Sequence, residues 1–212
     1  MTDSILTVTT AAASRDLTTL RRIKAELGIV DRKSDSLLRP WIREASGLIE
    51  TKTNRVFAQE TVSEMFRLRR HQRRDAIKLA RYPVTTIASV TDIDGTVLAA
   101  TSYEADLSTG MIWRLSGDAS PNDRRIWWDS GKITVAYTAG YVLMDSLPFP
   151  LEQACLTLLK HRWAAKDRDP MVTSEEVAGI ERSTFWIGAV GEDGALPPEV
   201  ESLIASFRDV RV

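Results

Sequence analysis

The residues best suited to chemistry are the basic side chains concentrated in one short stretch, residues 67–81 (RLRRHQRRDAIKLAR). Seven arginines and lysines stand there against a single acidic residue, Asp75, which gives the stretch a net charge of +6. Guanidinium groups bind phosphate and carboxylate oxygens, often in pairs of parallel hydrogen bonds. A surface that contacts several phosphates would bind nucleic acid with an affinity that falls steeply with salt. The residues that we expect to face DNA or a neighbouring subunit are Arg69, Arg70, Arg73 and Arg74.

Two interpretations of this basic stretch stay open: a hairpin that is solvated or contacts another subunit, and a surface that faces DNA. The stretch has no interleaved aromatic residues for stacking bases, and Ile77 and Leu79 predict that its second half is a strand. Residues 167–201 carry nine acidic and two basic residues, a net charge of −7. The two oppositely charged segments could therefore form the two sides of a contact between identical subunits.

The remaining polar residues form no recognisable catalytic or metal-binding pattern. His71 and His161 lack ligand or triad spacing, and Cys155 lies on the apolar stripe of a predicted helix, which favours a small buried thiol. The DIDG at 92–95 resembles the start of a calcium loop but lacks the downstream carboxylates, so a turn is the better interpretation. We predict that the protein is not an enzyme and binds no metal and no cofactor. The alternative is a hydrolase whose site the sequence does not reveal.

The composition is typical of a globular protein that works in solution. The 212 residues are 43% hydrophobic and 27% charged, and the net charge of −1 gives no global attraction to nucleic acid or to an anionic membrane. The single cysteine excludes an internal disulfide and is typical of a reducing compartment, such as a cytoplasm. The first residues lack the pattern of a signal peptide, and no run approaches the roughly 20 apolar residues of a membrane span.

Helical periodicity predicts a helical core built from two separate parts of the chain, residues 17–55 and 146–170. A first helix should run from a threonine N-cap to Gly28, which supplies the left-handed position after a helix. A second should begin one turn or so before Pro40, where a missing amide hydrogen costs little. A third should begin with Pro150 at its first position and bury one apolar face.

Between these parts, residues 56–145 alternate between apolar and polar residues, which predicts a β-rich insertion. The clearest strand is GKITVAYTAGY at 131–141, with apolar side chains at every second position from Ile133. Asp94-Gly95, flanked by apolar residues, predicts a two-residue hairpin turn with positive φ. The candidate strands are residues 57–67, 76–80, 86–92, 96–98, 102–106, 110–115 and 132–138.

The two ends of the chain look less regular. Residues 1–16 have no period and predict an arm that is disordered until it is bound. Residues 171–195 contain four glycines and predict an extended loop, after which Pro197 and Pro198 open a last helix. A helix of about a dozen residues is marginal alone, so its apolar stripe must be buried against some surface.

The order of these segments is more informative than any one of them. It runs LTTLRRIKAELGI, DSLLRPWIREASGLIETKTNRVF, RYPVTTIASVTDIDGTVLAATSYEADLSTGMIWRL and WWDSGKITVAYTAGY, which leads into LPFPLEQACLTLLKHRWAAKDRDP. Over roughly residues 17–170 this series resembles the head-tail connector proteins, also called adaptor or head completion proteins, of tailed phages and gene transfer agents.

The resemblance implies an α+β fold with a helical core, a β-rich insertion and an extended C-terminal arm over residues 171–212. It also implies a structural protein of the virion neck that forms a ring, typically a dodecamer, under the portal and extends the DNA exit channel. The implied partners are copies of the chain itself, the portal, a stopper, tail terminator or other neck protein, and packaged DNA; no membrane is implied. The alternative is a DNA-binding module that uses residues 67–81. Resembling adaptors reach the portal with their C-terminal end, so the expected portal-binding residues are Val200, Leu203, Ile204, Phe207, Arg208, Val210 and Arg211.

Overall fold

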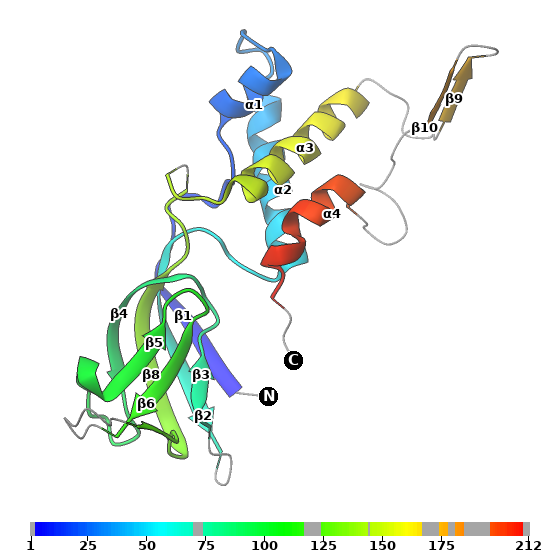
Figure 1. Cartoon of the computed structure of the whole chain (residues 1–212). Coiled ribbons are helices and arrows are strands. Elements are labelled where there is room, and N and C mark those ends of the chain that lie inside the picture. Colours follow the sequence, from blue (N-terminus) through cyan, green and yellow to red (C-terminus); the bar gives the residue numbers. More distant parts are fainter. Residues whose placement is uncertain are drawn as a thin grey trace. The chain divides into compact units, whose positions relative to one another are not determined.

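The chain folds into two compact units, and each unit takes residues from two separate stretches (Figure 1). The β unit comprises residues 1–14 and 56–142, and the helical unit comprises residues 15–55 and 143–212. The combination of helices with antiparallel sheets confirms the predicted α+β class. The structure is a computed structural model that describes residues 3–69, 74–116, 124–143, 145–166, 174–177, 181–184 and 196–209.

In the helical unit, α1 (Leu20–Leu27) has the ends that local signals predicted. The Thr19 side chain accepts a hydrogen bond from the backbone N–H of Arg22 at 3.1 Å, and Gly28 follows the helix with a φ of 67°. An N-cap hydroxyl satisfies a backbone donor that has no partner inside the helix, and glycine adopts the left-handed conformation without strain.

The longer helices of this unit are α2 (Asp35–Thr53) and α3 (Phe149–Ala165), which contact each other and α1. Pro40 lies inside α2, near its start, as expected. The side chains that form the core come from every helix of the unit, including α4 (Pro198–Ile204), which contacts α3. The fully or almost fully buried ones are Leu17, Ile23, Leu38, Ile42, Ile49, Leu151, Ala154, Cys155, Leu156, Leu159, Leu196, Val200 and Ile204. Among the described residues, no helix has both the length and the apolar character that crossing a membrane requires.

The β unit contains two antiparallel sheets. The first has the order β1-β2-β8-β4, formed by β1 (Asp3–Thr10), β2 (Glu60–Leu68), β8 (Gly131–Ala139) and β4 (Val84–Thr91). The second joins β3 (Ala76–Lys78), β6 (Met111–Leu115) and β5 (Tyr103–Asp106), and β7 (Arg125–Ile126) also pairs with β6. A 3₁₀ turn, η1 (Ala100–Ser102), precedes β5.

A single apolar core lies between the two sheets. Strand β8, in the interior of the first sheet, buries Ile133, Val135 and Tyr137 completely, which confirms the half-buried strand predicted from the alternation. Ile77 and Ile112 of the second sheet belong to the same cluster of buried residues. The sheets therefore depend on each other for burial of their apolar faces.

The expectation of a disordered arm over residues 1–16 was wrong for residues 3–10, which form β1. This strand pairs antiparallel with β2, from Asp3 opposite Arg67 to Thr10 opposite Thr61, with a register shift after Val8. It lies at the edge of the sheet and most of its side chains are exposed. An exposed edge strand lacks the regular alternation by which a half-buried strand is recognised.

The hairpin around Asp94-Gly95 exists, but its turn differs from the predicted one. The Gly95 N–H donates to the carbonyl of Asp92 at 3.0 Å, and the Asp92 N–H donates to the carbonyl of Thr96 at 2.8 Å. Gly95 has a φ of 84°, whereas Asp94 keeps a negative φ. The loop is therefore the three-residue type, in which only the last residue is left-handed, and not a two-residue turn with two positive φ angles.

The predicted loop over residues 171–195 also contains regular structure. Strands β9 (Ser174–Val177) and β10 (Glu181–Thr184) pair antiparallel, with Glu181 opposite Val177 and Thr184 opposite Ser174. The other residues of that loop lie outside the described part of the chain.

A buried polar contact connects β2, β8 and the chain after β3. Glu64 is 1% exposed, and its Oε2 accepts hydrogen bonds from the Tyr137 hydroxyl at 2.7 Å and from the Ala80 N–H at 2.9 Å. The Tyr137 oxygen in turn accepts from the Arg81 N–H at 3.3 Å. Burial, together with the nearby Glu64 carboxylate, raises the pKa of Tyr137 far above its usual range, so the hydroxyl keeps the proton that it donates.

Substitution Tyr137→Phe is expected to lower the free energy of unfolding by about 1–3 kcal/mol. The cause is that Glu64 stays buried while it loses its hydroxyl donor. Chemical denaturation measures this loss, and Tyr103→Phe is the matched control, since the described structure shows no hydrogen bond from the Tyr103 hydroxyl. Equal effects of the two substitutions would contradict the assignment.

The turn from β5 to β6 is organised by one carboxylate, that of Asp106. Its Oδ1 accepts from the Ser108 hydroxyl at 2.6 Å and its Oδ2 from the Thr109 hydroxyl at 2.6 Å, with further bonds from their backbone N–H groups. These hydrogen bonds favour the ionised form and lower the pKa of Asp106 to about 2.

We expect NMR titration of the Asp106 carboxyl to show a midpoint near pH 2. Because the folded pKa lies below the unfolded value of about 3.9, the carboxylate stabilises the fold fully above that value, and this contribution is lost as the pH falls toward 2. In a Ser108→Ala, Thr109→Val variant the midpoint should move up toward the ordinary value. An unchanged midpoint in that variant would show that the hydroxyls do not cause the shift.

Candidate functional site

The basic stretch is not the hairpin that the sequence suggested. Strand β2, which precedes it, pairs with β1 and β8, whereas β3, which follows it, pairs with β6 of the other sheet. Residues 69–75 therefore connect the two sheets. The sequence prediction missed this because the strand pattern on each side of a connection does not show which partner each strand takes.

Of the four arginines proposed to face DNA or a neighbouring subunit, the structure describes two. Arg69 is exposed, and Arg74 is partly exposed with its backbone held in place, because its carbonyl accepts a hydrogen bond from the Trp128 N–H at 2.7 Å. Arg70 and Arg73 lie outside the described residues, as does His71. The two arginines of the connection that the structure describes are thus exposed or partly exposed.

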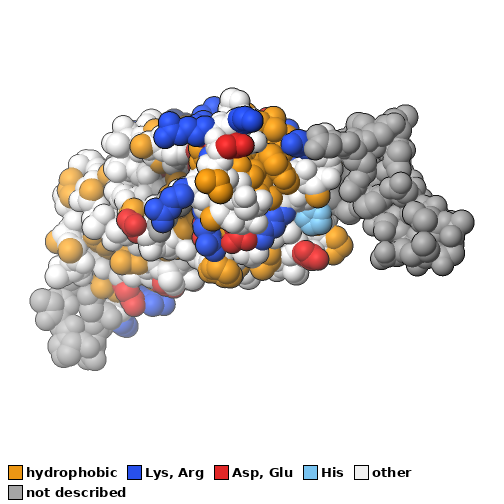
Figure 2. All heavy atoms as spheres, turned by 90° about the horizontal axis from the view of Figure 1, so that it is seen from above, with side chains coloured by type: hydrophobic (Ala, Val, Ile, Leu, Met, Phe, Trp, Pro, Cys, Tyr) orange, Lys and Arg blue, Asp and Glu red, His pale blue; other side chains and the backbone are white. Residues whose placement is uncertain are grey.

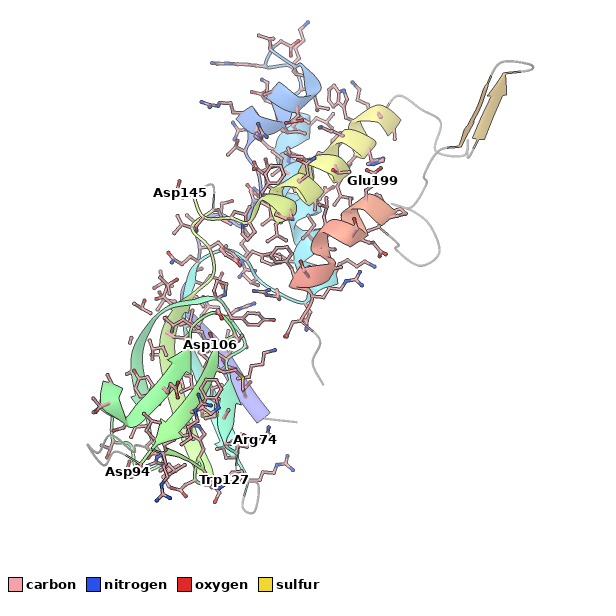
Figure 3. The ribbon with its side chains drawn as sticks, viewed as in Figure 1. Arg74, Asp94, Asp106, Trp127, Asp145 and Glu199 are labelled. Carbon is pink, nitrogen blue, oxygen red and sulfur yellow. The ribbon has the colours of Figure 1, made fainter. Side chains whose placement is uncertain are left out.

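An exposed aromatic residue accompanies these arginines at the same end of the β unit, and sequence reasoning missed it. Figure 3 shows Arg74 and Trp127 at this end, away from Asp106. The side chain of Trp127 is 54% exposed, while its neighbour Trp128 is fully buried and donates its indole N–H to the carbonyl of Ile112 at 3.3 Å. Trp128 therefore anchors the segment, and Trp127 remains available for a partner.

A second set of contacts stiffens this end of the β unit. The Arg114 guanidinium forms ion pairs with Asp92 at 2.6 Å and with Asp129 at 3.4 Å, and it lies 6.0 Å from the centre of the Trp128 ring. Asp92 is 8% exposed. Asp92 thus acts in a structural ion pair, which agrees with the turn interpretation of the DIDG segment.

In the C-terminal segment, our candidate for portal contact, some of the apolar side chains are buried and others are partly exposed. Val200 and Ile204 are fully buried in their own subunit, where α4 contacts α3, whereas Leu203 and Phe207 are partly exposed. In the single chain Val200 and Ile204 are thus covered by the helical core, so their expected contact with the portal stays a prediction that would require α4 to leave this position. The physical reason for the burial is that a short helix is marginal alone, and the helical core of the same chain already provides a surface on which these two side chains can be buried.

The chain after α4 is also tied back to its own subunit. A 3₁₀ turn, η2 (Ala205–Phe207), follows the helix, and the Asp209 N–H donates to the carbonyl of Thr53 at 2.9 Å. The Arg55 guanidinium donates to the carbonyl of Phe207 at 3.4 Å. Arg208 is exposed, and Val210 and Arg211 lie outside the described residues. The portion open to a partner is thus the outer side of residues 203–208.

The cysteine and the described histidine, which could have supported catalysis, lie in different surroundings. Cys155 is fully buried, and burial raises the pKa of its thiol to about 12, which confirms the small buried thiol that the sequence favoured. His161 lies exposed on α3. Among the described residues, no three histidine, cysteine, aspartate or glutamate side chains gather in a way that could hold a metal ion. On the face in Figure 2, acidic and basic side chains are intermingled.

Comparison with known proteins adds the family and the fold. The head completion protein family matches residues 16–210. Among solved structures, a chain of the neck of a native gene transfer agent (GTA) particle with C12 symmetry is 21% identical with a TM-score of 0.57, and the match covers 98% of this chain and 97% of that one. A chain of the native GTA virion is 20% identical with a TM-score of 0.58 and the same coverage. At these identities the structures show a shared fold. No curated protein matches the sequence.

The family match extends over nearly the whole chain and includes both units, from before α1 to the end of the described C-terminal segment. It confirms the resemblance seen in the order of the sequence segments. This chain belongs to the head completion protein family.

Proposed function

We propose that this protein is a structural adaptor of the virion neck. Twelve copies form a ring beneath the portal, extend the DNA exit channel and connect the capsid to a stopper, tail terminator or other neck protein. The observation that carries this proposal is the family match over residues 16–210. The nearly complete coverage of a chain from a neck with C12 symmetry supports it, because the whole fold is shared and not one module.

In this function the protein works by assembly and not by catalysis. A ring requires two different surfaces on each subunit that match when the subunits are related by rotation. The end of the β unit with Arg69, Arg74 and Trp127 is one surface suited to an acidic partner. The outer side of residues 203–208, with Leu203, Phe207 and Arg208, is the surface that we assign to the portal.

The experiment that tests the proposal is sedimentation of the purified protein alone and with its portal. We expect a monomer or weak oligomer alone and a ring on the portal, because binding to an oligomeric template supplies a high effective concentration. A tight dimer that persists in the presence of portal would contradict the proposal.

A DNA-contacting role of the β unit is the second candidate, and exposed Trp127 at the same end of the unit as Arg74 is the observation that favours it. Changing Arg69, Arg70, Arg73 and Arg74 to serine is expected to spare folding, since charges at exposed or partly exposed positions, such as those of Arg69 and Arg74, contribute little to stability. The variant should impair genome retention or neck assembly, measured as the yield of DNA-filled particles.

The matched control changes four exposed arginines of the helical unit, Arg21, Arg32, Arg39 and Arg43, to serine. A normal yield of DNA-filled particles from both variants would show that the basic stretch is only a solvated surface. Salt-sensitive binding of naked DNA by the wild-type monomer, lost in the first variant alone, would support the DNA-binding module.

A further inference from the structure

The end of the β unit that carries Trp127 also exposes aliphatic side chains. Figure 3 shows Asp94, in the hairpin after β4, at this end together with Arg74 and Trp127. Four large apolar side chains of the hairpin and of the chain around β7 are between 36% and 61% exposed, namely Ile93, Val97, Ile126 and Trp127. We call these four side chains the apolar tip. Exposed apolar side chains that gather on one surface mark a site of contact with a partner.

Close contacts hold the two parts of the apolar tip together. Arg114 of β6 is paired both with Asp92, in the hairpin, and with Asp129, in the segment that follows β7. Gly131, at the start of β8, lies directly against the hairpin, because a Cβ at Gly131 would come within 2.6 Å of Cγ2 of Ile93. The hairpin and the segment after β7 therefore form one preorganised surface, which a partner can bind at a small cost in ordering.

The charges around Trp127 favour a partner that brings carboxylates. Arg74 is bridged to the neighbouring Trp128, and Arg124 is exposed three residues before Trp127. Three acidic side chains of this region already have cationic partners: Asp92 and Asp129 pair with Arg114, and Glu104 pairs with Arg125. Complementary charges between partners steer their encounter and fix their register.

A protein surface fits the apolar tip better than duplex DNA does. Most protein–DNA hydrogen bonds go to phosphate and sugar oxygens, and the aliphatic side chains of Ile93 and Val97 cannot supply them. A tryptophan ring stacks on unpaired bases, which a duplex lacks. Tryptophan and arginine are instead the residues enriched at the centres of protein–protein interfaces.

A second copy of this chain offers no unpaired carboxylate on α1, α2 or α3. Every acidic residue of these three helices is ion-paired within the helical unit, and the pairs are Glu26–Lys160, Asp35–Lys24, Glu44–Arg162, Glu50–Arg15 and Glu152–Arg22. Contact of these helices with the tip would break an existing ion pair for each new one formed. The partner that the tip fits is therefore a different protein.

We propose that the apolar tip docks the protein that follows this one in the neck, and that Trp127 is the anchor of the contact. The partner surface has an apolar pocket for the Trp127 ring and carboxylates around it that meet Arg74 and Arg124. This inference rests on the proposed function and names the surface by which the ring is joined to the rest of the neck.

Tail attachment tests the proposal. Heads that carry the portal and a ring of wild-type or variant chain are incubated with tails and the remaining neck proteins from cells that lack this chain, and tailed particles are counted by electron microscopy. We expect Trp127→Ser to lower the tailed fraction by about tenfold or more, because loss of a buried tryptophan anchor typically has an effect of this size. Trp127→Phe should retain most of the attachment.

The matched control is Leu107→Ser, which changes an exposed apolar residue of the same unit next to Asp106, away from the tip. It should leave the tailed fraction unchanged. Val97→Ser changes the hairpin without touching the surroundings of Trp128, and it should lower the tailed fraction in the same direction as Trp127→Ser. Equal tailing by Leu107→Ser and both tip variants would overturn the proposal while leaving the proposed function intact.

Other occupants of the tip give different results. Loss of the ring on the portal in the Trp127→Ser protein would show that the tip contacts a second copy, and would overturn the proposal. Binding of duplex DNA by wild-type rings that Trp127→Ser abolishes, together with normal tailing, would assign the tip to DNA and would also overturn it. Failure of the wild-type protein to form a ring would instead contradict the proposed function.

The charge of the partner is tested separately at Arg124, which is exposed. Arg124→Glu should lower the tailed fraction, because the new carboxylate would repel those of the partner, whereas Arg124→Lys should retain it. Equal tailing by these two variants would contradict an acidic partner surface.

Discussion

Replacing Leu203 and Phe207 together with aspartate is expected to abolish docking to the portal while leaving the chain folded. Both side chains are partly exposed, so a partner has apolar area left to bury. Completing the burial of such side chains contributes about 1 kcal/mol each, at roughly 25 cal/mol per Å². Repeated around a ring, a loss of this size in every subunit removes the avidity on which docking depends. Co-sedimentation with the portal measures the effect.

The matched control places the same two charges on exposed apolar positions elsewhere in the helical unit, as Val30→Asp with Leu37→Asp. This control should dock normally. Retained docking by the Leu203 and Phe207 variant, or equal loss in the control, would contradict the assignment of this surface to the portal. Melting curves of both proteins must agree within a few degrees for the comparison to count.

Substitution Ile204→Asp is expected to destabilise the helical unit strongly, by about 4 kcal/mol or more. Ile204 is fully buried where α4 contacts α3, so the aspartate would bring a carboxylate into the apolar core without a partner. Chemical denaturation measures the loss, and the conservative change Ile204→Val should cost only about 0.5–1.5 kcal/mol.

The outcome also separates two roles of α4. If Ile204→Asp left the free energy of unfolding unchanged and only docking were lost, α4 would have to leave its own subunit in solution. That result would contradict the burial of Val200 and Ile204 in their own core.

Local signals in the sequence predicted the features that depend on a few adjacent residues. Thr19 and Gly28 mark the two ends of α1. The Thr19 hydroxyl satisfies a backbone N–H by itself, and Gly28 adopts the left-handed conformation by itself. The alternation from Ile133 to Tyr137 predicted β8 because its two faces lie in different surroundings, one buried and one partly exposed.

Features that depend on distant partners could not be predicted in this way. Strand β1 lacks a buried face with strict alternation, and only its β-branched run hinted at its conformation. The basic stretch was interpreted as a hairpin because its flanking strands follow each other in sequence, yet each pairs in a different sheet. Trp127 was missed as a surface residue because a Trp-Trp pair does not show which ring is buried.

The candidate sites divide in the same manner. Composition located the arginine-rich stretch, and a helical stripe located the C-terminal segment, but neither pattern shows which side chains remain open to a partner. The buried positions of Val200 and Ile204 depend on their contact with α3, about 40 residues earlier in the chain.

Electron cryo-microscopy of the particle neck tests the central claim most directly. The account predicts a closed ring of this protein, coaxial with the portal and immediately beneath it, in which residues 203–208 of each subunit contact the portal and the channel continues through the ring. Neck density without such a ring, or this protein bound elsewhere on the particle as single copies or isolated dimers, would contradict the account.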